Sequence, residues 1–210
     1  DYPVGSESLS DVIVVDLDAD NDLDILGVEP LTEQILLYTN DGQGNFAAPN
    51  ALVLTTGQSG VTINVLDAIG DDRLDLLVAH TSGLDLYEQT TSLVFGEAVA
   101  IDTDKNFTLT RIADINQDGR SDIVSSSNSS TGWYQNLGEG VFEYSSLVTE
   151  TSRDLEVFDL DQDGSFEIVV ALSSGRLAWF GAITLGVFDK GTTISSDSPS
   201  TLSITDFDLD

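Results

Sequence analysis

A nine-residue acidic segment recurs along this chain at nearly constant intervals, and this repetition constrains the fold more than any other feature. Its four complete copies are Asp16–Asp24 (loop one), Asp67–Asp75 (loop two), Asp114–Asp122 (loop three) and Asp159–Glu167 (loop four). A fifth copy begins at Asp206, and the first residues of successive copies are 51, 47, 45 and 47 residues apart. Periods of this length are typical of solenoids, propellers and other repeat architectures.

Aromatic residues keep the same interval as the acidic segments. A phenylalanine follows each opening Asp by 28–30 residues, and a second aromatic residue lies eight positions before it. The eight residues are Phe46, Phe95, Phe142, Phe188, Tyr38, Tyr87, Tyr134 and Phe180. The apolar stretches between these landmarks are short and have the period of strands, and none keeps a 3.6-residue period. We therefore expect an all-β fold.

Each repeat unit has room for four short strands. In the first unit we expect strands at Asp11–Val15, Ile25–Val28, Ile35–Tyr38 and Ala51–Thr55, with a Gly-rich turn at Asn40–Asn45. In the third we expect strands at Leu109–Ala113, Ile123–Ser126, Trp133–Gln135 and Ser145–Val148, with a turn at Asn136–Gly140. Four strands in about 47 residues is the size of one propeller blade.

The prediction for the fold is a single β-propeller over residues 1–210, built of four-stranded antiparallel blades. We place its repeat units at 8–57, 58–104, 105–150 and 151–197, with an incomplete unit at 198–210. This makes four full blades and one extra strand. The apolar faces of the end blades would then need cover from further blades or from another chain, and the terminal strand Thr201–Phe207 would offer an unpaired edge.

The acidic loops have the composition of a calcium site. Positions 1, 3 and 5 carry oxygen-bearing side chains, position 7 can add its backbone carbonyl, and the carboxylate at position 9 closes the cage. Hard oxygen donors at this density suit Ca²⁺ better than Mg²⁺, which requires a stricter octahedron. The candidate ligands are Asp16, Asp18, Asp20, Asp22 and Asp24; Asp114, Asn116, Asp118, Arg120 and Asp122; and Asp159, Asp161, Asp163, Ser165 and Glu167.

Two copies of the loop have weaker ligand sets. Loop two has Ile69 at position 3, which leaves Asp67, Asp71 and Asp75, and the fifth copy offers Asp206, Asp208 and Asp210. We therefore expect about three calcium ions, and loop two could be a turn that keeps its shape after losing its ion. At position 7 of loops two and three, we expect the side chains of Arg73 and Arg120 to point outward.

An EF-hand begins with a similar pattern but is excluded by the residues beyond position 9. It requires a bidentate Glu at position 12, where this chain has Gly27, Val78, Ser125 and Val170. It also requires flanking helices, whereas β-branched strand sequences flank these loops. The sequence predicts strand–loop–strand calcium sites instead.

The net charge is −30, from 37 acidic and 7 basic residues, and 19 of the acids lie in the five loop copies. A salt-adapted acidic surface would explain the remaining excess but not the fixed spacing. The charge disfavours nucleic acid as a partner, and no apolar run is long enough to insert into a membrane. Because there is no Cys, disulfides and thiolate metal sites are excluded.

The motifs resemble the FG-GAP/VCBS repeat family, which includes the N-terminal propellers of integrin α subunits. The matching patterns are Asp-x-Asp-x-Asp-Gly-x-x-Asp followed by Ile-Val, and aromatic-x-Asn-x-Gly-x-Gly-x-Phe as in Tyr38–Phe46. The name-giving string is present in part, at Phe95-Gly96 and Ala47-Ala48-Pro49. Since members usually have seven blades, the resemblance implies that the chain is part of a larger ring.

The resemblance implies a non-catalytic, calcium-binding module outside the cell that mediates adhesion or binds a protein or glycan. The alternative is the propeller of a polysaccharide-degrading enzyme, such as a lyase, or a lectin. We expect no catalytic residue: the single His80 has no nucleophile motif beside it, and carboxylate pairs are too abundant here to be informative. The strand aromatics, which are Tyr38, Tyr87, Trp133, Tyr134, Trp179 and Phe180, are expected to belong to the core rather than to stack on sugars.

Overall fold

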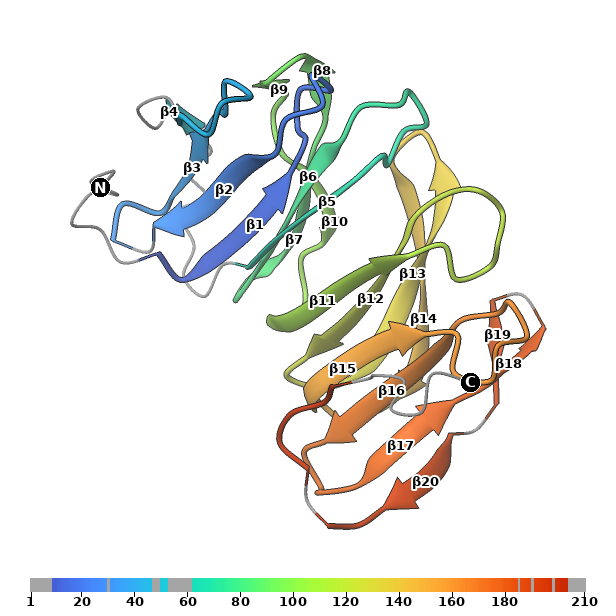
Figure 1. Ribbon diagram of the computed structural model, residues 1–210. Coiled ribbons are helices and arrows are strands. Elements are labelled where there is room, and N and C mark those ends of the chain that lie inside the picture. Colours follow the sequence, from blue (N-terminus) through green and yellow to red (C-terminus); the bar gives the residue numbers. More distant parts are fainter. Residues whose placement is uncertain are drawn as a thin grey trace. The chain divides into compact units, whose positions relative to one another are not determined.

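The strands of the computed structural model form one four-stranded antiparallel sheet for each complete repeat (Figure 1). The structure describes residues 9–29, 31–46, 50–52, 62–184, 186–189, 191–197 and 199–203. These residues form strands, turns and no helix, so the all-β prediction is confirmed. No helix in these ranges is long and apolar enough to cross a membrane.

Within each sheet the strands follow one another in chain order. The first sheet contains β1 (Asp11–Val15), β2 (Asp24–Glu29), β3 (Gln34–Tyr38) and β4 (Asn50–Leu52). The second contains β5 (Thr62–Leu66), β6 (Asp75–His80), β7 (Gly83–Tyr87) and β10 (Val99–Asp102). The third contains β11 (Phe107–Ala113), β12 (Asp122–Ser127), β13 (Thr131–Gly138) and β14 (Val141–Val148). The fourth contains β15 (Ser152–Phe158), β16 (Glu167–Leu172), β17 (Leu177–Phe180) and β20 (Thr192–Ser195).

Two small hairpins interrupt the path from the third to the fourth strand of a sheet. They are β8 (Gln89–Thr91) with β9 (Val94–Phe95) in the second sheet, and β18 (Ala182–Thr184) with β19 (Val187–Phe188) in the fourth. In the first sheet a single bridge between Asn40 and Phe46 stands at this place. The phenylalanine landmark of the sequence therefore marks this connection.

The third sheet differs from the expectation at this connection. The predicted turn at Asn136–Gly140 was too long, because β13 continues to Gly138 and pairs there with Val141 of β14. The two residues between them, Glu139 and Gly140, have φ values of 54° and 72°. A two-residue turn with both φ angles positive matches the twist of the strands that it joins, so the strands pair up to the turn.

The chain divides into two compact units, Asp1–Asn106 and Phe107–Asp210, each with two of the four sheets. In the first unit β1 contacts β5, and the backbone N–H of Ile63 donates to the Asp11 carboxylate at 2.9 Å. In the second unit β11 contacts β15, where Arg111 pairs with Glu156. In both units the first strands of consecutive sheets thus lie side by side.

Apolar side chains fill the space between the two sheets of each unit. In the first unit the buried cluster is Leu17, Leu26, Val28, Ile35, Leu37, Ile63, Leu76, Val78 and Tyr87. In the second it is Ile115, Val124, Trp133, Leu155, Ile168, Val170, Leu172, Ala178 and Phe180. Burial of each large aliphatic side chain contributes about 1.5–3 kcal/mol to stability. The acidic loops lie at the ends of these layers, because each one joins the first strand of a sheet to the second.

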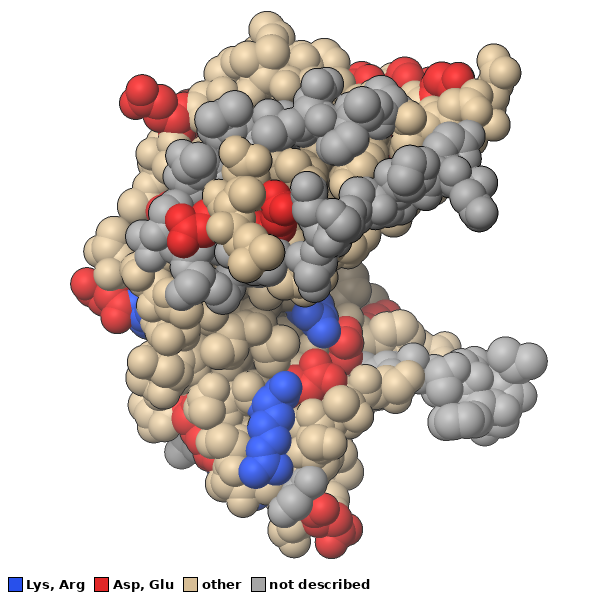
Figure 2. Space-filling model, turned by 90° about the vertical axis from the view of Figure 1, so that its left-hand side faces the viewer, with Lys and Arg blue, Asp and Glu red and all other residues tan. Residues whose placement is uncertain are grey.

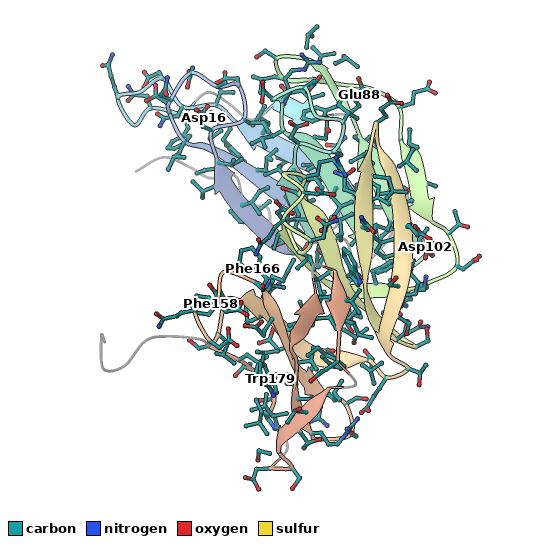
Figure 3. All side chains as sticks on the ribbon, turned by 90° about the vertical axis from the view of Figure 1, so that its right-hand side faces the viewer. Asp16, Glu88, Asp102, Phe158, Phe166 and Trp179 are labelled. Atoms are coloured by element: carbon teal, nitrogen blue, oxygen red, sulfur yellow. The ribbon has the colours of Figure 1, made fainter. Side chains whose placement is uncertain are left out.

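The strand aromatics are mainly core residues, as expected. Tyr87, Trp133, Tyr134 and Phe180 are buried. Tyr38 and Trp179, the latter labelled in Figure 3, are partly exposed at their sheet faces. The terminal strand expected at Thr201–Phe207 lies largely outside the described residues, as do Ala47-Ala48-Pro49 and the three candidate ligands Asp206, Asp208 and Asp210.

Candidate metal centre: the acidic loops

Each acidic loop turns sharply with the help of two residues in the left-handed region. At position 6, Asn21, Asp72, Gly119 and Gly164 have φ values of 73°, 64°, 85° and 91°. Gly and Asn are residue types that visit this region readily. Position 4 is also left-handed, at Ala19, Gly70, Gln117 and Gln162, with φ values of 61°, 83°, 55° and 59°. Apart from Gly70, the residue types at position 4 do not indicate this second bend.

The Asp at position 1 organises the turn by accepting backbone hydrogen bonds. In loop one, Asp16 accepts from the N–H groups of Asp20 at 3.1 Å and Asn21 at 2.9 Å. Asp67 and Asp114 accept from the equivalent groups of loops two and three. In loop four only one oxygen of Asp159 is used in this way, by the N–H of Gly164 at 3.0 Å.

The carboxylate at position 9 is buried in every loop, and in loops one to three it connects the loop to the third strand or to the residues just after it. Asp122, for example, accepts from the N–H of Ile115 at 3.0 Å and from the N–H of Asn136, just after the aromatic of β13, at 2.7 Å. Asp24 and Asp75 have the same two kinds of partner. Glu167 accepts from the N–H of Leu160 at 2.8 Å. The position-9 carboxylate therefore holds the loop in place as well as facing its interior.

Two loops bring three carboxylates together. Oxygens of Asp16, Asp18 and Asp24 in loop one lie within 4.8 Å of one another, and so do oxygens of Asp159, Asp161 and Glu167 in loop four. In Figure 3, Asp16 is labelled in loop one, and the labelled Phe158 and Phe166 lie directly before loop four and at its position 8. The predicted ligands at positions 1, 3 and 9 are thus adjacent in these loops.

Each of these two clusters contains a buried carboxylate oxygen without a hydrogen-bond partner. These atoms are Asp18 Oδ1 and Asp159 Oδ1, two of the three such side-chain oxygens in the part of the chain that the structure describes. A buried polar atom without a partner is costly. Burial, together with the neighbouring carboxylates of Asp20, Asp24 and Asp16, raises the pKa of Asp18. A bound cation would supply the missing partner and remove the repulsion, so these residues fit a hard cation.

The side chains at position 5 accept hydrogen bonds from the backbone of their own loops. The position-5 residues Asp20, Asp118 and Asp163 each accept the backbone N–H of position 7, at 2.9, 3.0 and 2.7 Å. These carboxylates lie outside the groups of three that loops one and four bring together. At position 7, Asp22 and Ser165 therefore contact the position-5 carboxylate of their loop through their backbone N–H groups.

Loop three has an amide where loops one and four have a carboxylate. Asn116 Oδ1 accepts the backbone N–H of Asp118, and Asn116 Nδ2 donates to the carboxylate of Asp118 at 2.9 Å. Burial raises the pKa of Asp122 to about 6, against the effect of its backbone hydrogen bonds. Loop three therefore has the ligand positions of the other two with one negative charge fewer at position 3.

The arginines at position 7 keep about two fifths of their side chains exposed, but their guanidinium groups contact the loop instead of extending into solvent. Arg120 folds back, donating from Nη2 to Asp118 at 2.5 Å and from Nε to the carbonyl oxygen of Asn136 at 2.9 Å. Arg73 makes the corresponding contacts with Asp71 and with the carbonyl oxygen of Gln89. A planar guanidinium can reach both acceptors at once, which a fully exposed side chain would not do.

One set of residues at the site was missed by sequence reasoning. Asn40, Gln89 and Asn136 donate through their side-chain amides to the carbonyl oxygens at position 8, which are those of Leu23, Leu74 and Ser121. Their backbone N–H groups are the donors to position 9. The signal was present as the third residue of the aromatic-x-Asn pattern, but nothing in the pattern indicated that it contacts the loop.

His80 is buried at the opposite end of β6 from loop two. Its Nε2 lies 3.1 Å from an oxygen of Asp85, and its Nδ1 accepts the backbone N–H of Ser82. Both ring nitrogens of His80 therefore have hydrogen-bond partners in neighbouring residues.

The surface carries more acidic than basic side chains. Figure 2 shows this excess on one face, where several basic groups lie beside acidic ones.

Comparisons with known proteins agree with the repeat architecture. A family model for the FG-GAP-like repeat matches residues 16–78 and 114–170, together more than half of the chain. These ranges begin at the first Asp of loops one and three. A comparison with curated proteins finds no match.

Several solved structures share the fold at low sequence identity. A lectin from Agrocybe aegerita, solved for its specific recognition of non-reducing terminal N-acetylglucosamine, is 20% identical with a TM-score of 0.66, over 90% of this chain and 52% of its own. BBS1N in complex with ARL6DN is 17% identical with a TM-score of 0.63, over 91% and 56%. The V. cholerae biofilm matrix protein Bap1 is 22% identical with a TM-score of 0.50, over 87% and 27%.

The chain spans about half the length of the lectin and BBS1N structures. At these identities the likeness concerns the fold, and it confirms the predicted β-propeller architecture of four-stranded antiparallel sheets. The family model independently matches two segments, each of which contains two acidic loops and their strands. The chain belongs to the FG-GAP-like repeat family.

Proposed function

We propose that this chain is a non-catalytic propeller module that binds calcium through its acidic loops and recognises a protein or glycan outside the cell. The observation that carries the proposal is the pair of buried carboxylate oxygens without partners, Asp18 Oδ1 and Asp159 Oδ1, each within a group of three acids. Among the described residues, two of the three buried side-chain atoms without a hydrogen-bond partner thus fall within these two groups.

Calcium suits these loops better than other common cations do. Positions 1, 3 and 9 offer carboxylate oxygens alone, which disfavours the softer transition metals. Loop one is also exposed at positions 4 to 6, where solvent can supply additional oxygens. Ca²⁺ accepts six to eight such ligands in flexible geometry, whereas Mg²⁺ requires a near-ideal octahedron. In loop one Asp16, Asp18 and Asp24 would hold the ion, and in loop four Asp159, Asp161 and Glu167 would do so.

Loop three is proposed as a weaker site of the same kind. Asp114, Asn116 and Asp122 occupy the three ligand positions, but Asp118 is already paired with Arg120. A ligand set of lower charge attracts a dication less strongly. We therefore expect loop three to fill after loops one and four.

The role of the ion in this proposal is structural. Each loop joins the first two strands of a sheet, and in loops one to three the position-9 carboxylate also accepts a backbone N–H from the third strand or from the residues just after it. A cation that neutralises the loop would therefore stabilise the sheet as a whole, since a ligand that binds only the folded state adds to its stability. The proposal includes no catalytic step, and His80 is engaged by Asp85 and Ser82.

Recognition of a protein or glycan is supported by what the similar structures bind. The Agrocybe aegerita lectin recognises non-reducing terminal N-acetylglucosamine, and BBS1N is in complex with ARL6DN. An extracellular location is supported by the type of site, because calcium loops of extracellular modules bind in the roughly 10⁻⁴–10⁻³ M range. Such sites would be empty at the calcium level of a cytosol.

The first test is thermal unfolding in excess chelator and in millimolar calcium. We expect the melting temperature to rise with calcium, and Asp159→Asn to reduce this rise while the exposed control Glu97→Gln leaves it unchanged. An identical melting temperature in chelator and in calcium would refute the metal-binding part. Binding to a glycan array with and without calcium, and the cellular location of the full-length product, test the other parts.

A further inference from the structure

Loop two has a positive charge of its own where a metal ion would otherwise be required. The guanidinium of Arg73 pairs through Nη2 with the position-5 carboxylate of Asp71. Its Nε donates to the carbonyl oxygen of Gln89 at 2.7 Å, beyond the end of β7. The arginine therefore links the loop to Gln89, the first residue of β8, which follows the third strand of the sheet.

The carboxylates at positions 1, 5 and 9 of loop two have hydrogen-bond partners on both oxygens. Asp67 accepts the N–H groups of Gly70, Asp71 and Asp72. Asp71 accepts the backbone N–H of Arg73 on Oδ1 and the guanidinium on Oδ2. Asp75 accepts the N–H groups of Ala68 and Gln89, at 2.9 and 2.8 Å. No orphaned oxygen like those of loops one and four occurs among them.

Position 3 points to the same conclusion. Loops one and four place Asp18 and Asp161 there, within the groups of three carboxylates. Loop two has Ile69, a side chain without a donor atom. A cation in loop two would therefore lack one of the three ligands, the one that supplies the oxygen without a partner in loop one.

We propose that Arg73 is the resident cation of loop two, and that this loop keeps its fold without a metal ion. The planar fork of the guanidinium suits this task, because it reaches a carboxylate and a carbonyl in a fixed geometry. The residues at positions 3 and 7 together then determine whether a loop binds metal. A loop with Asp at position 3 and a short side chain at position 7 binds metal, whereas a loop with Ile at position 3 and Arg at position 7 does not. This inference rests on the proposed calcium sites of loops one and four.

Loop three supports the assignment because it makes the same two arginine contacts. Arg120 pairs with Asp118 and donates to the carbonyl oxygen of Asn136. It retains an oxygen donor at position 3, Asn116, and so keeps a ligand set that loop two has lost. The arginine alone is therefore insufficient to displace a metal, and the combination with Ile69 is what distinguishes loop two.

The first experiment measures the thermal stability of the full 210-residue chain with Arg73→Gln. We expect the melting temperature to fall by about 2–4 °C, and by the same amount in chelator and in millimolar calcium, because the arginine acts without metal. The matched control is Arg153→Ala, since Arg153 is exposed and donates a hydrogen bond to the Ser173 carbonyl oxygen, outside the acidic loops. No loss of stability in Arg73→Gln, or a loss seen only in calcium, would overturn the proposal.

The second experiment counts calcium ions by isothermal titration calorimetry. Asp71→Asn should leave the number of bound ions unchanged, and the double variant Ile69→Asp/Arg73→Ser should bind one more ion than the parent chain. A loss of one ion in Asp71→Asn would show that loop two binds metal, which contradicts the proposal. Failure of the folded double variant to gain a site, with folding checked by circular dichroism, would also count against it.

The two proposals can fail separately. If the parent chain bound no calcium, the proposed function would be wrong, but the stability of Arg73→Gln in chelator would still decide the role of the arginine. If Arg73→Gln did not fold, the ion count of Asp71→Asn, which retains the size of the side chain, would decide it.

Discussion

Asp122 accepts a hydrogen bond from the backbone N–H of Asn136 at 2.7 Å, which ties the last residue of loop three to the third strand of its sheet. The side chain of Asn136 returns the contact by donating to the carbonyl oxygen of Ser121, beside Asp122. The same pair of contacts recurs between Asp75 and Gln89. The acidic loops are therefore parts of the sheet framework, and not surface turns attached to it.

The framework role predicts a large loss of stability in Asp122→Ala. The change leaves the buried N–H groups of Ile115 and Asn136 without an acceptor, and each unsatisfied group costs about 1–3 kcal/mol. We expect the free energy of unfolding in urea to fall by about 2–4 kcal/mol, in chelator as well as in calcium. Asp118→Ala is the comparison, since Asp118 lies at an exposed position of the loop and its partner Arg120 is partly exposed. An equal loss in both variants would contradict the framework role.

The pKa of Asp122 predicts an unusual response to pH. Its folded-state pKa of about 6 lies above the ordinary value of 3.8, and burial also raises the pKa values of Asp75 and Glu167. A carboxyl group that binds its proton more tightly in the folded state stabilises that state fully below its unfolded pKa. This contribution is lost as pH rises through the folded pKa. In chelator, the free energy of unfolding should therefore increase as pH is lowered from about 7 to about 5.

The control for the pH prediction is Asp122→Asn, which removes one of the titrating groups. Its free energy of unfolding should change less over the same pH interval than that of the parent chain. In calcium the trend should be weaker or reversed, because protons and the cation compete for the same loops. A steady loss of stability on acidification in chelator would refute the prediction.

The left-handed conformation at position 6 predicts which of two substitutions at Gly119 destabilises the fold more. Its φ is 85°, and no atom lies within 4 Å of the place where a Cβ would be. Gly119→Ala should therefore cost only the backbone strain, about 1–2 kcal/mol. Gly119→Asn should cost less, since Asn visits this region readily and Asn21 occupies the same position in loop one. Urea unfolding of the two variants gives the comparison, and equal losses would be inconsistent with it.

The repeat spacing made much of the fold predictable. The interval between acidic loops, with short apolar stretches on both sides, indicated one four-stranded sheet per repeat, as β11 to β14 illustrate. The extent of β13 was not predictable from strand propensity. It depends on a turn at Glu139 and Gly140 in which Glu takes a positive φ, and Glu does not signal that conformation.

The direction of the loop arginines depended on contacts that a linear pattern does not contain. Arg120 and its acceptor Asn136 are 16 residues apart, and they meet only because β13 pairs with β12 beside the loop. Likewise, the loop pattern identified Asp122 as a ligand but did not indicate that two backbone N–H groups already use its oxygens. The sequence alone identified the residue types that bind a cation. The structure was needed to show which of their oxygens are already used by hydrogen bonds within the sheet.

The most direct test of the proposed metal sites is the number of calcium ions that the chain binds, measured by isothermal titration calorimetry after removal of metal. We predict at least two ions, one of which is lost in Asp18→Asn and another in Asp159→Asn, while Glu97→Gln retains them all. The orphaned oxygens of Asp18 and Asp159 are the reason for this expectation. A chain that binds no calcium in this titration, or variants that both retain the full number of ions, would contradict the assignment of these loops as calcium sites.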